Sequence, residues 1–139
     1  MNIEDAKILV AARIASMTAA LQIGHWNIRV VFERLPDGVM AQCNSDPRYQ
    51  HSTITIDPAQ NEPDEIIRNL RHELIHIVLA EFEVPFDSAR DEFSTKEGKN
   101  LLFEMQRNAV ERSVNHIERI MDGLGATADW LSSPKEEAA

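Results

Sequence analysis

The stretch that most constrains the fold is His72-Glu73-Leu74-Ile75-His76, which lies inside a segment with helical periodicity. Two histidines four residues apart project from the same face of a helix, one turn from each other. A proline and two acidic residues at 63–65 suit the first turn of that helix, which we expect to end at about Ala80. The segment also carries an apolar stripe, which predicts that the helix packs against a core. The stripe consists of Ile66, Ile67, Leu70, Leu74, Ile77 and Val78.

The spacing of the two histidines is typical of a zinc site, because both imidazoles can reach one ion at about 2.0–2.1 Å. Glu73 follows the first histidine and is expected to point into the same cleft, where it can accept a proton from a metal-bound water. The alternative is a surface helix with two unrelated histidines, but the apolar stripe argues against that interpretation. We therefore expect one Zn²⁺ per chain, with His72 and His76 as ligands and Glu73 as the catalytic residue.

Length and charge narrow the classes of protein to which the chain can belong. Its 139 residues suit one domain, which we expect to span 1–131 before a disordered tail at 132–139. The net charge of −9 opposes nonspecific binding to nucleic acid, which depends on neutralising phosphates. No apolar run approaches the roughly 20 residues of a membrane span, and the acidic start lacks a signal-peptide pattern. Cys43 is the single cysteine and is expected to be a buried strand residue. We therefore predict a cytoplasmic protein, with neither nucleic acid nor a membrane as a partner.

The segments before the motif helix predict one helix and three strands. Residues 3–21 lack proline and glycine and keep apolar residues at helical spacing, which predicts one long helix that backs the sheet. Segments at 26–32, 39–44 and 52–57 alternate in polarity or are rich in β-branched residues, as strands are. The turn residues at 36–38 predict a hairpin between the first two strands. The fold class is therefore α+β, with a small three-stranded sheet.

Two further segments are expected after the motif helix. Residues 84–100 contain proline, glycine, serine and many charges, which predicts an irregular, partly mobile loop and a candidate lid. Residues 101–122 predict a long C-terminal helix with one apolar face.

The order of these elements resembles that of the zincin metallopeptidases. The likeness rests on W-N-I-R-V at 26–30, I-T-I-D at 54–57 and H-E-L-I-H at 72–76, and only the last is a specific motif. The chain looks most like the small zincin-like proteins of phages and prophages, and SprT-like domains and minigluzincins share the plan. The resemblance implies a small sheet over a backing helix, with the motif helix beneath it. It also implies that the last strand before the motif helix forms the rim of the cleft, where Thr53–Ile56 would bind an extended peptide.

A catalytic zinc requires a third protein ligand and an open position for water. The SprT-like pattern would supply a histidine, for which the candidates are His116, His51 and His25. The gluzincin pattern would supply a glutamate from a later helix, and the candidates, which share one helix edge at spacings of seven, are Glu104, Glu111 and Glu118. The metzincin extension is absent, because residues 77–84 contain neither glycine nor histidine.

Among these candidates we favour Glu111. It lies in the middle of the predicted helix beside Val110 and Val114, where that helix should pack against the motif helix. Asn115, one turn later, is a candidate for positioning its carboxylate by a hydrogen bond.

The motif predicts a zinc-dependent metallopeptidase in which Glu73 acts as general base in hydrolysis of a peptide or protein substrate. Tyr49 or His51 could stabilise the oxyanion, although an ordinary turn tyrosine is the favoured interpretation of Tyr49. A non-catalytic zincin-like module, binding zinc or a peptide, is the main alternative, followed by a helical domain without metal. The sequence leaves the substrate, the cleavage specificity and the oligomeric state open.

Overall fold

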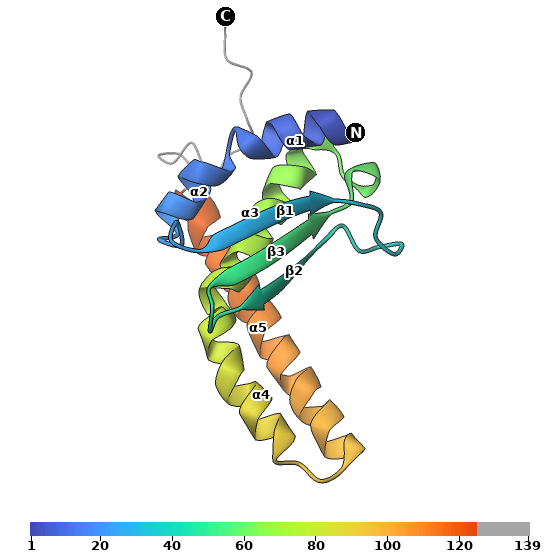
Figure 1. Ribbon diagram of the computed structural model, residues 1–139, viewed down its shortest axis with the longest axis vertical. Coiled ribbons are helices and arrows are strands. Elements are labelled where there is room, and N and C mark those ends of the chain that lie inside the picture. Colours follow the sequence, from blue (N-terminus) through green and yellow to red (C-terminus); the bar gives the residue numbers. More distant parts are fainter. Residues whose placement is uncertain (125–139) are drawn as a thin grey trace, which may run out of the picture.

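The computed structural model describes residues 1–124 as an α+β arrangement of helices around a three-stranded mixed sheet (Figure 1). The predicted fold class is confirmed at this level. The predicted tail at 132–139 and the predicted domain end at 131 lie outside the described residues. Within residues 1–124, no helix combines the length and the apolar character needed to cross a membrane.

The sheet has the order β1-β3-β2, so β3 occupies its centre. The strands are β1 (Asn27–Phe32), β2 (Ala41–Asp46) and β3 (His51–Ile56). β1 runs parallel to β3, and β2 runs antiparallel to it. The predicted hairpin between the first two strands is wrong, because β2 instead turns back through residues 47–50 to pair with β3. The most deeply buried of the three strands takes the central position, where both of its edges are hydrogen-bonded.

The predicted peptide-binding rim at Thr53–Ile56 is therefore also wrong. These residues belong to β3, whose two edges are already paired with β1 and β2, so no further strand can add there. The free edge on the other side of β2 remains available among the described strands.

The predicted N-terminal helix is divided in two, α1 (Ile3–Ala11) and α2 (Ile14–Ala20). No proline or glycine marks the division. Ala6 and Val10 of α1 and Met17 of α2 are buried in one core with β1, β3 and the motif helix, so the helical periodicity survives the interruption.

The motif helix is α3 (Pro63–Leu79), preceded by a short 3₁₀ turn, η1 (Pro58–Gln60). The backbone N–H of Glu62 donates to the Glu65 carboxylate at 3.2 Å, which satisfies one end group of the helix. The apolar face of α3 packs against the sheet and α1, as the sequence predicts, except that Val78 is exposed. Its fully buried members in this core are Ile66, Leu70, Leu74 and Ile77.

The predicted loop at 84–100 is wrong, because most of it is helical. A 3₁₀ turn, η2 (Ala80–Phe82), leads into α4 (Glu83–Asp91), and α5 (Lys96–Leu124) begins before the loop was expected to end. Pro85 lies in the first turn of α4, where its missing N–H breaks no intrahelical bond. The two helices run side by side as an arm that extends beyond the sheet (Figure 1).

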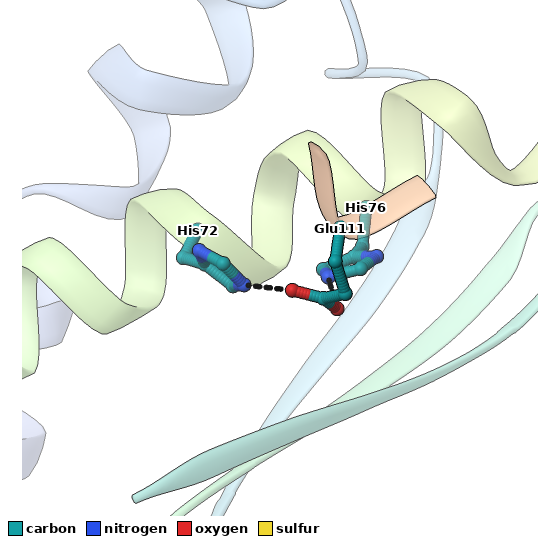
Figure 2. A group of neighbouring side chains, drawn as sticks. All are labelled: His72, His76 and Glu111. Atoms are coloured by element: carbon teal, nitrogen blue, oxygen red, sulfur yellow. Dashed lines mark ion pairs between the residues drawn. The ribbon is translucent and has the colours of Figure 1, made fainter. Parts of the chain in front are cut away.

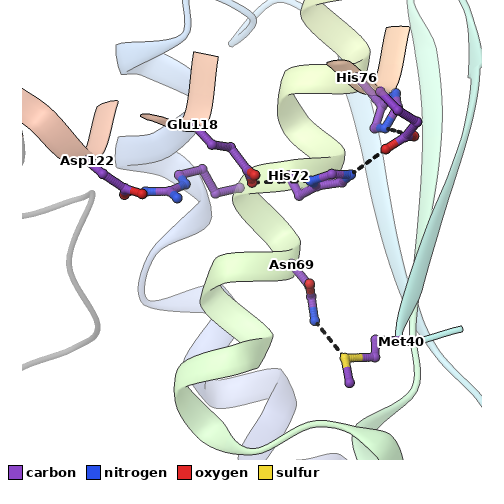
Figure 3. Close-up of polar contacts among 8 residues, drawn as sticks. Met40, Asn69, His72, His76, Glu118 and Asp122 are labelled. Atoms are coloured by element: carbon purple, nitrogen blue, oxygen red, sulfur yellow. Dashed lines mark hydrogen bonds and ion pairs between the residues drawn. The ribbon is translucent and has the colours of Figure 1, made fainter. Parts of the chain in front are cut away.

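A second, smaller cluster of buried residues attaches α5 to α3. It consists of Ile75, Val114 and Met121. The buried guanidinium of Arg71 adds an ion pair, with Nη1 lying 2.9 Å from Oδ1 of Asp122 (Figure 3).

Candidate metal centre

Helices α3 and α5 bring His72, His76 and Glu111 together (Figure 2). Oε1 of Glu111 lies 2.9 Å from Nε2 of His76, and its Oε2 lies 3.5 Å from Nε2 of His72. One potential ligand atom from each residue lies within 4.8 Å of the others. Ligands at about 2.0–2.1 Å from a tetrahedral zinc are separated from each other by about 3.3 Å. The donor set and its spacing therefore fit a zinc ion after side-chain adjustments of about an ångström.

The position of Glu111 follows from the packing of α5. Val114, less than one turn later, is buried against Ile75 of α3. Because residues three apart lie on neighbouring parts of one helix face, this contact directs Glu111 toward the histidines. Its side chain is 43 % exposed, so the cluster remains accessible from outside the protein.

Glu118 lies behind the cluster and contacts His72 rather than the shared centre. Its Oε1 is 3.2 Å from Nδ1 of His72 (Figure 3). With the proton on Nδ1, the imidazole donates to Glu118 and leaves the lone pair of Nε2 directed at the other two residues. The hydrogen bond to Glu118 is also the main cause of the raised pKa of His72, against the opposing effect of burial.

The sequence marked Glu118 only as a candidate ligand, and this positioning role was missed. The spacing of seven residues from Glu111 is the signal that could have indicated it, because it places both carboxylates on one helix edge. The predicted positioning residue, Asn115, is exposed and forms no hydrogen bond with Glu111 among the described residues.

Glu73 is buried, with 7 % of its surface exposed. Burial raises its pKa to about 7, attraction by His72 opposes the rise, and repulsion by Glu111 and Glu118 adds to it. Burial likewise lowers the pKa of His76, against the attraction of Glu111. A carboxyl group with a pKa close to neutral is suited to take and return a proton at neutral pH. A neutral His76 is the form that can bind a metal.

The other predicted candidates lie outside this group. Glu104 and His25 are exposed, and His116 lines a separate shallow hollow on α5. His51 begins β3, where its ring lies 6.4 Å from that of Tyr49. Tyr49 is 66 % exposed in the turn before β3, in keeping with an ordinary turn tyrosine.

A pocket of about 330 Å³ adjoins the cluster, and His76 and Glu111 form part of its wall. Cys43 of β2 closes one side of it, and residues of α4 and α5 form the rest. The Cys43 thiol contacts the hydroxyls of Ser45 and Ser52, each at 3.2 Å. Burial raises the pKa of this thiol, which favours its neutral form. Cys43 lies in a strand, as predicted, but it is half-buried rather than buried. The pocket itself was not foreseen, because it depends on α4.

Comparison of the chain with protein-family models, with curated proteins and with solved structures gave no match.

Proposed function

We propose that the protein is a zinc-dependent peptidase with a zincin-like fold, in which His72, His76 and Glu111 hold the metal. The observation that carries the proposal is the convergence of these three side chains within 4.8 Å, beside a buried glutamate that follows the first histidine. Zinc bound there would polarise the substrate carbonyl and make water a stronger nucleophile at neutral pH.

Other residues of the chain would transfer the proton, position His72 and bind the substrate. Glu73 accepts the proton of the attacking water and passes it to the leaving nitrogen, for which its pKa of about 7 is suited. Glu118 holds the His72 ring in one orientation through the contact of 3.2 Å. The free edge of β2, next to the pocket, replaces β3 as the strand that an extended substrate would join.

Replacing Glu73 with glutamine tests this proposal. We expect Glu73→Gln to retain one zinc per chain by elemental analysis while peptide hydrolysis falls by a factor of at least about 10² to 10⁴. Glu104→Gln, an exposed change on α5, serves as the matched control and should retain both zinc and activity. Equal hydrolysis by Glu73→Gln and the wild type would refute the role of Glu73. Failure of the wild type to bind zinc would refute the centre.

A non-catalytic zinc-binding or peptide-binding module is the second candidate. The exposed position of Tyr49 favours it, because this tyrosine does not line the pocket beside the cluster, where an oxyanion would develop. A hydroxamate, which binds an open metal position, separates the two candidates. Cobalt-loaded protein whose visible spectrum changes with hydroxamate has such an opening, whereas a closed structural site would show no change.

A further inference from the structure

The pocket beside the cluster has a wall in which two polar side chains, Glu83 and Gln106, form no ion pair or hydrogen bond through their side chains among residues 1–124. It lies between β2, α4 and α5, and it shares His76 and Glu111 with the proposed metal centre. Its other polar residues are Glu83, Asp87, Arg90, Gln106 and Arg107. The chemistry of these groups indicates what the pocket accepts.

Gln106 is the most unusual of them. Its side chain lines the pocket, yet the residue is only 7 % exposed. Its Oε1 is fully buried, and within residues 1–124 the amide has no hydrogen-bond partner. A buried amide without a partner is unfavourable for the free protein, and it gains the most when a ligand supplies the missing hydrogen bond.

The charged groups differ in how well they are already satisfied. Nη2 of Arg90 lies 3.3 Å from Oδ1 of Asp87, and its guanidinium lies over the Phe103 ring at 5.6 Å. Arg107 is exposed and therefore solvated by water. Glu83 is half-buried and forms no ion pair among the described residues. Burial raises the pKa of Glu83, and repulsion by Asp87 adds to it, so a cation nearby would relieve both effects.

We propose that this pocket binds a lysine or arginine side chain of the substrate, with Glu83 and Gln106 as its specificity-determining residues. The cationic head donates hydrogen bonds to the Glu83 carboxylate, and it reaches the Gln106 amide oxygen, which is closed off from solvent in the free protein, once that side chain rotates toward the pocket. The aliphatic stem packs against Phe103 and Val110, which also line the pocket. The net charge of −9 attracts basic peptides toward the protein. This inference rests on the proposed function in one respect, since it takes the bound molecule to be a peptide.

Peptide binding by the zinc-loaded Glu73→Gln variant tests the pocket without hydrolysis. The probes are fluorescent hexapeptides in a neutral background, with one lysine or one norleucine placed at each position in turn. We expect lysine at one position to strengthen binding by about tenfold or more over norleucine, the effect of one charge-assisted hydrogen bond. Adding Glu83→Gln or Gln106→Leu should reduce that ratio to below about threefold. Glu81→Gln, an exposed change two residues from Glu83, should leave it unchanged.

A stability measurement separates loss of recognition from damage to the fold. Gln106→Leu removes an unpartnered buried amide, so its melting temperature should equal or exceed that of the parent. Absence of any lysine preference in the parent would overturn the inference. A lysine preference that is as large in both pocket variants as in the parent would also overturn it. So would a preference for glutamate that disappears in Arg107→Gln, because the pocket would then select an acid.

The same peptides distinguish this inference from the proposed function. Lysine-selective binding without cleavage by the wild type would refute the peptidase and leave the pocket assignment standing. Cleavage of peptides without any basic preference in binding or hydrolysis would refute the pocket assignment alone.

Discussion

The buried carboxyl group of Glu73 should make the metal-free protein less stable as the pH rises, and Glu73→Gln should remove that loss. Burial is the main cause of its raised pKa of about 7, compared with the ordinary value of 4.5 expected in the unfolded chain. Between these two values the folded protein retains a proton that the unfolded chain has released. The free energy of unfolding therefore decreases as the pH increases through this range.

The difference between the pKa of Glu73 in the unfolded chain, 4.5, and in the folded protein, about 7, determines the change in the free energy of unfolding. It corresponds to about 3 kcal/mol once the pH exceeds both values. Glutamine resembles the protonated acid in shape and cannot ionise. The variant should thus be more stable than the wild type by about 3 kcal/mol at pH 8, and by less than about 1 kcal/mol at pH 5.

Urea denaturation followed by circular dichroism, with a chelator present, measures this difference. The comparison of variant with wild type at each pH removes most of the effect that neighbouring groups such as His72 have on the free energy of unfolding. Glu104→Gln provides the control for a glutamate that is exposed on α5. A stability gap that is absent at pH 8, or equal at both pH values, would refute the conclusion that burial destabilises the ionised form.

Two further predictions concern the contact between α3 and α5. Glu118→Gln should weaken zinc binding by about 10- to 100-fold, because His72 loses a charged positioning partner. A competition titration with a chromophoric chelator measures the affinity, and an unchanged value would contradict that role. Zinc should slow amide hydrogen exchange in α5 more than in β3, because the metal would join α5 to α3 across a small apolar cluster. Equal slowing in both elements, or no slowing in either, would contradict this prediction.

The parts of the fold that could be predicted are those in which local pattern and burial agree. The motif helix was predictable because its apolar stripe, its start and its histidine spacing all indicate one helix. The grouping of Glu111 with the two histidines was predictable because Val114, three residues later, carries the contact that orients it. Both inferences needed only the geometry of single helices and the assumption that the C-terminal helix packs against the motif helix.

The sheet order and α4 could not be derived in the same way. The order of the strands depends on which strand has both edges hydrogen-bonded to neighbours. The alternation of Ile54 and Ile56 does not distinguish such a central strand from an edge strand with one exposed face. Residues 83–91 have no buried member, and Pro85 together with the many charges of this segment resembles a loop in the sequence. The composition of this segment resembles a loop because the helix lies on the surface of the arm.

The error at α4 also explains why the pocket was not foreseen, since both the pocket and the metal centre depend on where α5 lies. Three residues of α5 contribute to these features. Gln106 lines the pocket, Glu111 completes the proposed metal-binding group, and Glu118 contacts His72. The packing of α5 on α3 through Val114 therefore sets the geometry of all three at once. In this arrangement, the proposed metal binding and the proposed side-chain selection would not be independent properties. Each would stabilise the position of α5 on which the other depends.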